Sequence, residues 1–73
     1  MEIKSNVPIR QRRCLLAENK RYIVGDKIRV VTDKPYEGII HDISPFAITL
    51  DYCGLYNLKV IFFDQINSLR RIL

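Results

Sequence analysis

The amino-acid sequence predicts a mainly β protein, a small five-stranded barrel preceded by a short N-terminal α-helix. From Phe46 to Asp51 apolar and polar residues alternate, so one face of this strand is expected to be buried and the other wetter. Turn residues recur about every 8–12 residues from Gly25 onward, a spacing typical of barrels and sandwiches. Five short strands are too few for a sandwich of ordinary size, which favours the barrel.

The chain of 73 residues is expected to form one domain. Residues 1–21 are predicted to be a leader followed by a basic helix or arm, and residues 22–73 to be the barrel. Ile9 and Leu16 lie one heptad apart with arginines between them, which is compatible with a short amphipathic helix over residues 8–19. The same pattern fits a mobile arm, and both interpretations stay open at this point.

Five predicted strands build the barrel, separated by turn residues such as Ser44-Pro45. Gly38 lies where a strongly curved strand needs a residue without a side chain. Asp64 lies in a one-turn connector between the last two strands. It is expected to cap this connector by accepting hydrogen bonds from backbone N–H groups. The strands are expected at residues 27–32, 36–43, 46–52, 58–63 and 66–72.

The fourth predicted strand is apolar on both faces, because Val60-Ile61-Phe62-Phe63 contains no polar residue. One face can fill the barrel, but the other has to be covered by the helix or by another subunit, since an uncovered apolar edge strand is an aggregation hazard. The chain is 48% apolar and short, so some apolar side chains are expected to face a partner chain. The candidate residues for a homo-oligomer interface are Val60, Ile61, Phe63 and Leu69.

The net charge of +4 is concentrated at the N-terminal end of the chain. Residues 1–29 hold eight basic and three acidic groups, a net of +5, whereas residues 30–73 hold four basic and five acidic groups, a net of −1. A basic segment of this kind either keeps a small protein in solution or binds nucleic-acid phosphates through counterion release. The candidates for such contacts are Arg10, Arg12, Arg13, Lys20, Arg21 and the single histidine, His41.

Catalysis is not expected, because the chain has one histidine, no nucleophile–base pair and no glycine-rich phosphate loop. Cys14 and Cys53 form no C-x-x-C pair and lack the histidines of a zinc site, so no metal or other cofactor is expected. No apolar run reaches the roughly 18 residues of a transmembrane helix, and the first residues lack the apolar core of a signal peptide. A cytoplasmic protein with no membrane partner and no evident small-molecule substrate is therefore expected.

The curved strand and the strand after it resemble the first signature of Sm-like proteins, and are most similar to the bacterial host-factor RNA chaperones. The resemblance covers about residues 22–72 and is carried by Gly38, Ile40, Ile43, Phe46, Ile48 and Leu50. It implies a five-stranded SH3-like barrel and a homo-oligomeric ring in which the fourth and fifth strands of neighbouring subunits pair. It also implies binding of uridine-rich single-stranded RNA near the central pore, with bases stacked on an aromatic residue at the position of Phe46.

The chain departs from this family pattern at both of its signatures. Ser44-Pro45 replaces an acidic residue and the polar residue after it, and Phe63-Asp64 takes the place of the Lys-His pair of the uridine pocket. Because an acid at this place would repel an RNA backbone, RNA binding is expected to depend more on the basic N-terminal segment and His41. Phe46 has two interpretations: a core residue that starts the inward-facing series, or a platform for base stacking.

Two functions of different classes follow from these observations. The first is an Sm-like nucleic-acid-binding protein that acts as a homo-oligomeric ring, with single-stranded RNA as the expected partner. Its affinity for RNA should fall as the salt concentration rises. The second is an SH3-like protein-interaction or regulatory module, a monomer or dimer with no nucleic-acid role.

Overall fold

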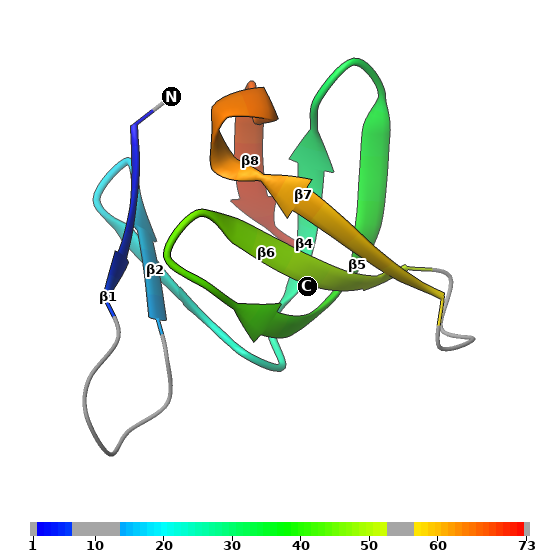
Figure 1. Ribbon diagram of the computed structural model, residues 1–73, viewed down its shortest axis with the longest axis horizontal. Helices are drawn as coiled ribbons and strands as arrows, with labels where there is room; N and C mark the ends of the chain where they lie inside the picture. The colour runs from blue at the N-terminus through cyan, green and yellow to red at the C-terminus, as the bar shows by residue number, and fades with distance from the viewer. Residues whose placement is uncertain (1, 7–13, 53–56, 73) are drawn as a thin grey trace.

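Two antiparallel sheets make up the computed structural model, which describes residues 2–6, 14–52 and 57–72. The N-terminal sheet has three strands in the order β1-β2-β3 and lies at the blue-to-cyan end of the chain in Figure 1. Its strands are β1 at Ile3–Asn6, β2 at Cys14–Ala17 and β3 at Lys20–Ile23.

The helix predicted over residues 8–19 is wrong in the part that the structure describes, because residues 14–17 form β2. Leu15 is fully buried whereas the next residue, Leu16, is 38% exposed, and this alternation has the period of a strand. A two-residue turn with φ angles of 50° and 65° then joins β2 to β3, which is the backbone of a tight hairpin. Residues 8–13, the rest of the predicted helix, lie outside the described residues.

The larger sheet confirms the five strands predicted for the second part of the chain. Neighbouring strands are all antiparallel, and their order is β7-β6-β5-β4-β8. No ladder joins the edge strands β7 and β8 within the described residues, so what the structure shows is an antiparallel sheet and not a closed barrel. The elements are β4 at Lys27–Val31, β5 at Pro35–Ile43, β6 at Ala47–Tyr52, β7 at Leu58–Phe62, a 3-10 turn η1 at Phe63–Gln65, and β8 at Ser68–Arg71.

Gly38 allows β5 and β6 to approach closely. A Cβ atom at this position would lie 2.4 Å from the carbonyl oxygen of Asp51, so any side chain here would displace the backbone of β6. A shift in the register of β5 against β6 follows between Ile40 and Asp42, and such a bulge increases the local twist of a strand. The predicted need for glycine in this strand is confirmed.

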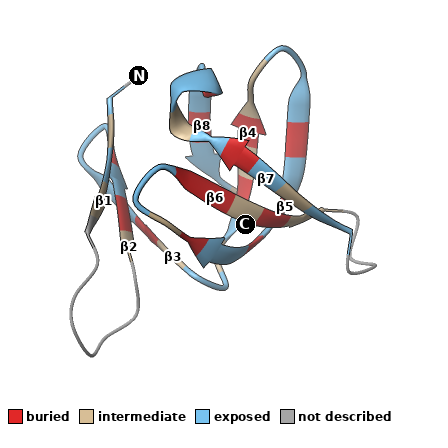
Figure 2. Ribbon diagram, in the orientation of Figure 1, coloured by how far each residue is buried: buried red, intermediate tan, exposed pale blue. Residues whose placement is uncertain are grey.

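Both sheets bury side chains in one core, drawn in red in Figure 2. From the N-terminal sheet, Tyr22 reaches the larger sheet and is almost completely buried. Asn67 Nδ2 donates a 2.8 Å hydrogen bond to the carbonyl oxygen of Thr32, which holds the β7–β8 connection against the β4–β5 turn. The core consists of Leu15, Ala17, Tyr22, Ile28, Val30, Tyr36, Ile40, Ile43, Ile48, Leu50, Ile61, Ile66 and Leu69.

Candidate nucleic-acid interface

Phe46 lies in the turn between β5 and β6, and its side chain is 68% exposed. The hydroxyl of Ser44 organises this turn, because it accepts a 3.0 Å hydrogen bond from the backbone N–H of Ala47 and donates one of 3.0 Å to the Ala47 carbonyl. The inward-facing series therefore begins after the turn, at Ile48, and does not include Phe46. The interpretation of Phe46 as a core residue is wrong, and its side chain is available at the surface.

The β5–β6 turn meets the connector that follows β7. The backbone N–H of Phe63 donates a 2.9 Å hydrogen bond to the carbonyl of Phe46, so two segments that are distant in sequence are joined at this point. A surface hollow of about 240 Å³ lies between them, lined by Phe46, Phe62, Phe63 and Asp64. Phe62 is about half exposed, and Phe63 is packed partly against the core. The hollow is thus an aromatic surface with one carboxyl group.

Asp64 does not cap the connector, contrary to the sequence-based expectation. The residue before η1 makes no capping bond through its side chain, and Ile66 N–H instead donates to the carbonyl of Phe63. Within the described residues the Asp64 carboxylate has no hydrogen bond or ion pair, and the side chain is exposed. Its acceptor oxygens are therefore open to a molecule that enters the hollow.

The outward face of β7 continues the apolar surface beyond the hollow. Leu58, Val60 and Phe62 are each about half exposed, on a strand that is also an edge of the sheet. Of the predicted interface residues, Val60 belongs to this row. The side chains of Ile61 and Leu69 are buried in the core, so only their backbone atoms are available for a contact with another chain.

The candidate basic residues that the structure describes, Lys20, Arg21 and His41, do not line the hollow. Lys20 and Arg21 are exposed on β3, in the N-terminal sheet. His41 is exposed on β5, the strand that leads into the turn of Phe46. Arg10, Arg12 and Arg13 lie outside the residues that the structure describes.

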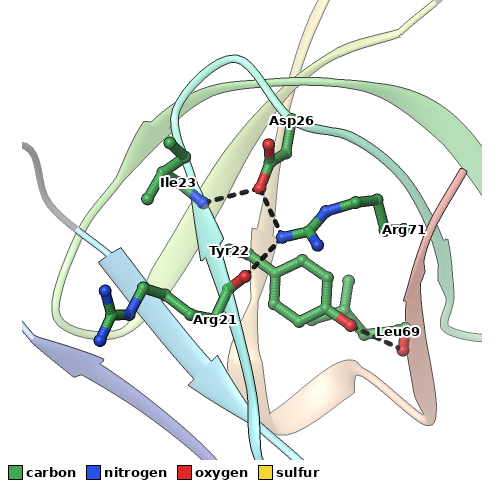
Figure 3. A network of polar contacts seen from close by, with 6 residues as sticks. All are labelled: Arg21, Tyr22, Ile23, Asp26, Leu69 and Arg71. Atoms are coloured by element: carbon green, nitrogen blue, oxygen red, sulfur yellow. Dashed lines mark hydrogen bonds and ion pairs between the residues drawn. The ribbon is translucent and has the colours of Figure 1, made fainter. Parts of the chain in front are cut away.

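A second cluster is centred on Tyr22, where hydrogen bonds and an ion pair join residues of β3, the turn after it and β8 (Figure 3). The Tyr22 hydroxyl donates a 3.5 Å hydrogen bond to the carbonyl of Leu69 on β8. The guanidinium of Arg71 lies 5.3 Å from the centroid of the Tyr22 ring, donates to the carbonyl of Arg21, and forms a 3.0 Å ion pair with Asp26. Burial raises the pKa of the Tyr22 hydroxyl, and Arg71 acts in the opposite direction.

A larger hollow of about 520 Å³ is lined by residues of β5, β7, the β4–β5 turn and the segment from η1 to β8. The ammonium group of Lys59 lies there, 4.9 Å from the centroid of the Tyr36 ring. In the same hollow, a 2.8 Å hydrogen bond from the Thr32 hydroxyl lowers the pKa of Asp33. Thr32 and Asp33 in this hollow are thus hydrogen-bonded to each other, and Asn67 donates to the Thr32 carbonyl.

Sequence reasoning predicts Phe46 as a candidate for base stacking and Phe63 as a candidate for the oligomer interface, and the family resemblance places Phe63-Asp64 at the uridine pocket. The lining residue that it misses is Phe62. The sequence indicates Phe62 only as part of an apolar strand, and it predicts for Asp64 both a cap of the connector and repulsion of an RNA backbone. The signal that was available is the run Phe62-Phe63-Asp64 at the end of a strand, because two consecutive aromatic residues cannot both enter one core when side chains alternate between faces.

No helix among the described residues is both long and apolar enough to cross a membrane. In the same residues, no group of three or more His, Cys, Asp and Glu side chains is placed to hold a metal ion. No protein-family model, curated protein or solved structure matches this chain.

Proposed function

We propose that this protein is an Sm-like homo-oligomer that binds single-stranded RNA without catalysing a reaction. The observation that carries the proposal is the exposed aromatic hollow of Phe46, Phe62 and Phe63. It lies where the turn after the first family-like segment meets the connector after β7, the place where the resemblance expects stacked bases. A phenyl ring that is 68% exposed buries little apolar surface against the described residues, whereas base stacking on such a ring is worth about 1–3 kcal/mol per base.

The fold that we propose for residues 22–73 is a small SH3-like barrel. Two features support it: the close approach of β5 and β6 at Gly38, and the bulge that follows it on β5. Both features curve a sheet strongly. The inner faces of all five strands also contribute to a single core, as they do when a sheet turns back on itself.

The two edges of the larger sheet support assembly of identical chains. Within the described residues, β7 is an edge strand that carries the exposed apolar row of Leu58, Val60 and Phe62. β8 is the second edge strand, and its Leu69 carbonyl already accepts a hydrogen bond from Tyr22. If β7 of one protomer pairs with β8 of the next, both edges gain hydrogen bonds and part of the apolar row is covered. Such a head-to-tail contact closes into a ring when the rotation between neighbours permits it.

Phosphate contacts are assigned to the basic residues outside the hollow. The candidates are Lys20, Arg21 and His41, which are exposed, together with Arg10, Arg12 and Arg13. The net charge of +4 favours attraction of a polyanion. Counterion release by such contacts makes the affinity for RNA decrease as salt increases.

The first test is the native mass in solution, measured by light scattering at low and high salt. A stable particle of several 8.6 kDa protomers is expected. Binding of fluorescent single-stranded RNA is then followed by anisotropy over a salt series. A monomer or dimer that binds no RNA at any salt concentration would overturn the proposal and favour the protein-interaction module instead.

The stacking role is tested with Phe46→Ala. The expected result is a loss of RNA affinity of about 5- to 150-fold, the equivalent of one stacked base. Leu16→Ala is the matched control, because it removes an exposed apolar side chain from the N-terminal sheet and leaves the hollow intact. Equal RNA affinities of the two variants would assign the binding to another surface.

A further inference from the structure

The carboxylate of Asp64 gives the aromatic hollow a chemical preference of its own. An ionised carboxylate only accepts hydrogen bonds, so it favours a ligand edge that donates and disfavours one that accepts. Asp64 has no partner among the described residues, and the other three lining residues are phenylalanines, which offer no competing polar side chain. Among the described residues that line the hollow, the single side chain able to form hydrogen bonds is therefore an acceptor.

Nucleobases differ in the way they match this acceptor. Uracil presents a single ring N–H between two carbonyl oxygens, both of which a carboxylate repels. Cytosine and adenine each present an exocyclic amino group, and carboxylates are established acceptors for the cytosine amino group. Guanine presents a ring N–H and an amino group side by side, which can donate together to the two oxygens of one carboxylate, the stronger bidentate arrangement.

We propose that the hollow of Phe46, Phe62, Phe63 and Asp64 selects nucleobases that carry an amino group, guanine above cytosine and adenine, and discriminates against uracil. This selectivity rests on the proposed RNA-binding function, which it deepens. The aromatic rings supply the stacking surface, and Asp64 supplies the base preference. The uridine preference that the family resemblance implies is thereby reversed, because Phe63-Asp64 stands in place of the Lys-His pair.

The Asp64 carboxylate also affects which part of the RNA enters the hollow. It repels phosphate groups, and none of the described residues that line the hollow is basic. A base can therefore enter the hollow while its phosphate backbone stays outside it, where exposed basic residues such as those of β3 can bind phosphates. Salt dependence and base preference consequently arise from different residues and can be measured separately.

The experiment uses four RNA oligonucleotides of equal length: a uridine tract, and alternating uridine–guanosine, uridine–cytidine and uridine–adenosine sequences. Their phosphate charge is the same, so affinity differences at one salt concentration report the bases. Wild-type protein should bind the uridine–guanosine RNA about 5- to 10-fold more tightly than the uridine tract. This difference is at the lower end of what a bidentate contact to a base provides, because Asp64 is exposed to solvent. The cytidine and adenosine sequences should lie between these two.

Asp64→Asn tests the assigned residue, because asparagine keeps the shape of aspartate but can donate as well as accept. The difference between guanosine and uridine sequences should then fall below about twofold, mainly through tighter binding of the uridine tract. Glu18→Gln is the matched control, since it removes one negative charge from an exposed turn of the N-terminal sheet. It should raise the affinities for all four RNAs together and leave their order unchanged.

The outcomes separate this selectivity from the function on which it rests. Equal affinities of wild-type protein for all four RNAs, all weakened by Phe46→Ala, would overturn the base selectivity and leave RNA binding in place. A guanosine preference that persists in Asp64→Asn would show that Asp64 does not select the base. Absence of binding to every RNA would remove the proposed function together with the selectivity. Unchanged thermal unfolding of Asp64→Asn confirms that the variant is folded.

Discussion

The clusters around Tyr22 and around Phe46 are both aromatic, yet they are built in opposite ways. Tyr22 is buried, and its hydroxyl and ring are engaged by β8 through Leu69 and Arg71. Phe46 is exposed beside Asp64, a carboxylate that has no partner within the described residues. In the first cluster the Tyr22 hydroxyl and the Arg71 guanidinium form hydrogen bonds within the chain. In the second cluster the Asp64 carboxylate has no such bond to a described residue.

This difference separates stability from recognition. A buried aromatic residue whose hydroxyl and neighbouring charges are paired contributes to folding, because its loss leaves a cavity and unpaired partners. An exposed aromatic residue beside an unpaired carboxylate contributes little to folding and can interact with a ligand. Substitutions at the two clusters should therefore affect different measurements.

The largest effect is expected from Tyr22→Ala. Removal of this buried ring should lower the free energy of unfolding by about 3–5 kcal/mol, as for other large aromatic side chains in cores. Phe46→Ala should change it by no more than about 0.5 kcal/mol, because the side chain is mostly exposed. Urea denaturation at one protein concentration measures both. The comparison fails if the two substitutions destabilise the protein equally.

A smaller effect is expected from Arg71→Met, which keeps much of the side-chain length but removes the ion pair with Asp26 and the cation–π contact with Tyr22. The expected loss is about 1 kcal/mol, because both partners of the pair are partly exposed and solvent screens them. Arg29→Met is the control, since it breaks a single, more exposed ion pair with Glu37. A loss in RNA affinity specific to Arg71→Met would assign this cluster to binding as well.

The smallest effect is expected from Tyr22→Phe, and it depends on pH. Burial raises the folded-state pKa of Tyr22 above its usual value near 10, so this group stabilises the fold fully below pH 10. Its contribution is lost as the pH rises through the raised pKa, because the unfolded chain then ionises more readily. The melting temperature of the wild-type protein should therefore fall more steeply above pH 10 than that of Tyr22→Phe. If the melting temperatures of the two proteins change with pH in parallel, ionisation of Tyr22 does not contribute to the pH dependence of stability.

Strand patterns over residues 27–72 were predictable because alternation is a local property of the chain. The five strands and the requirement for glycine at position 38 follow from side-chain periodicity and backbone sterics. Prediction failed at residues 14–17, where the heptad spacing indicated a helix. In the structure, β2 pairs with β1 and β3 on its two sides, and burial of Leu15 against the core selects the strand.

The sequence by itself determined the β class of the chain, the order of its strands along the chain, and a surplus of apolar residues on β7. Only the tertiary structure decided that Phe46 faces solvent, that it meets Phe63 across a turn, and that Asp64 has no partner among the described residues. The physical reason is that alternation depends on neighbours in sequence. The exposure of a turn residue and the pairing of a carboxylate depend instead on which distant segments approach it.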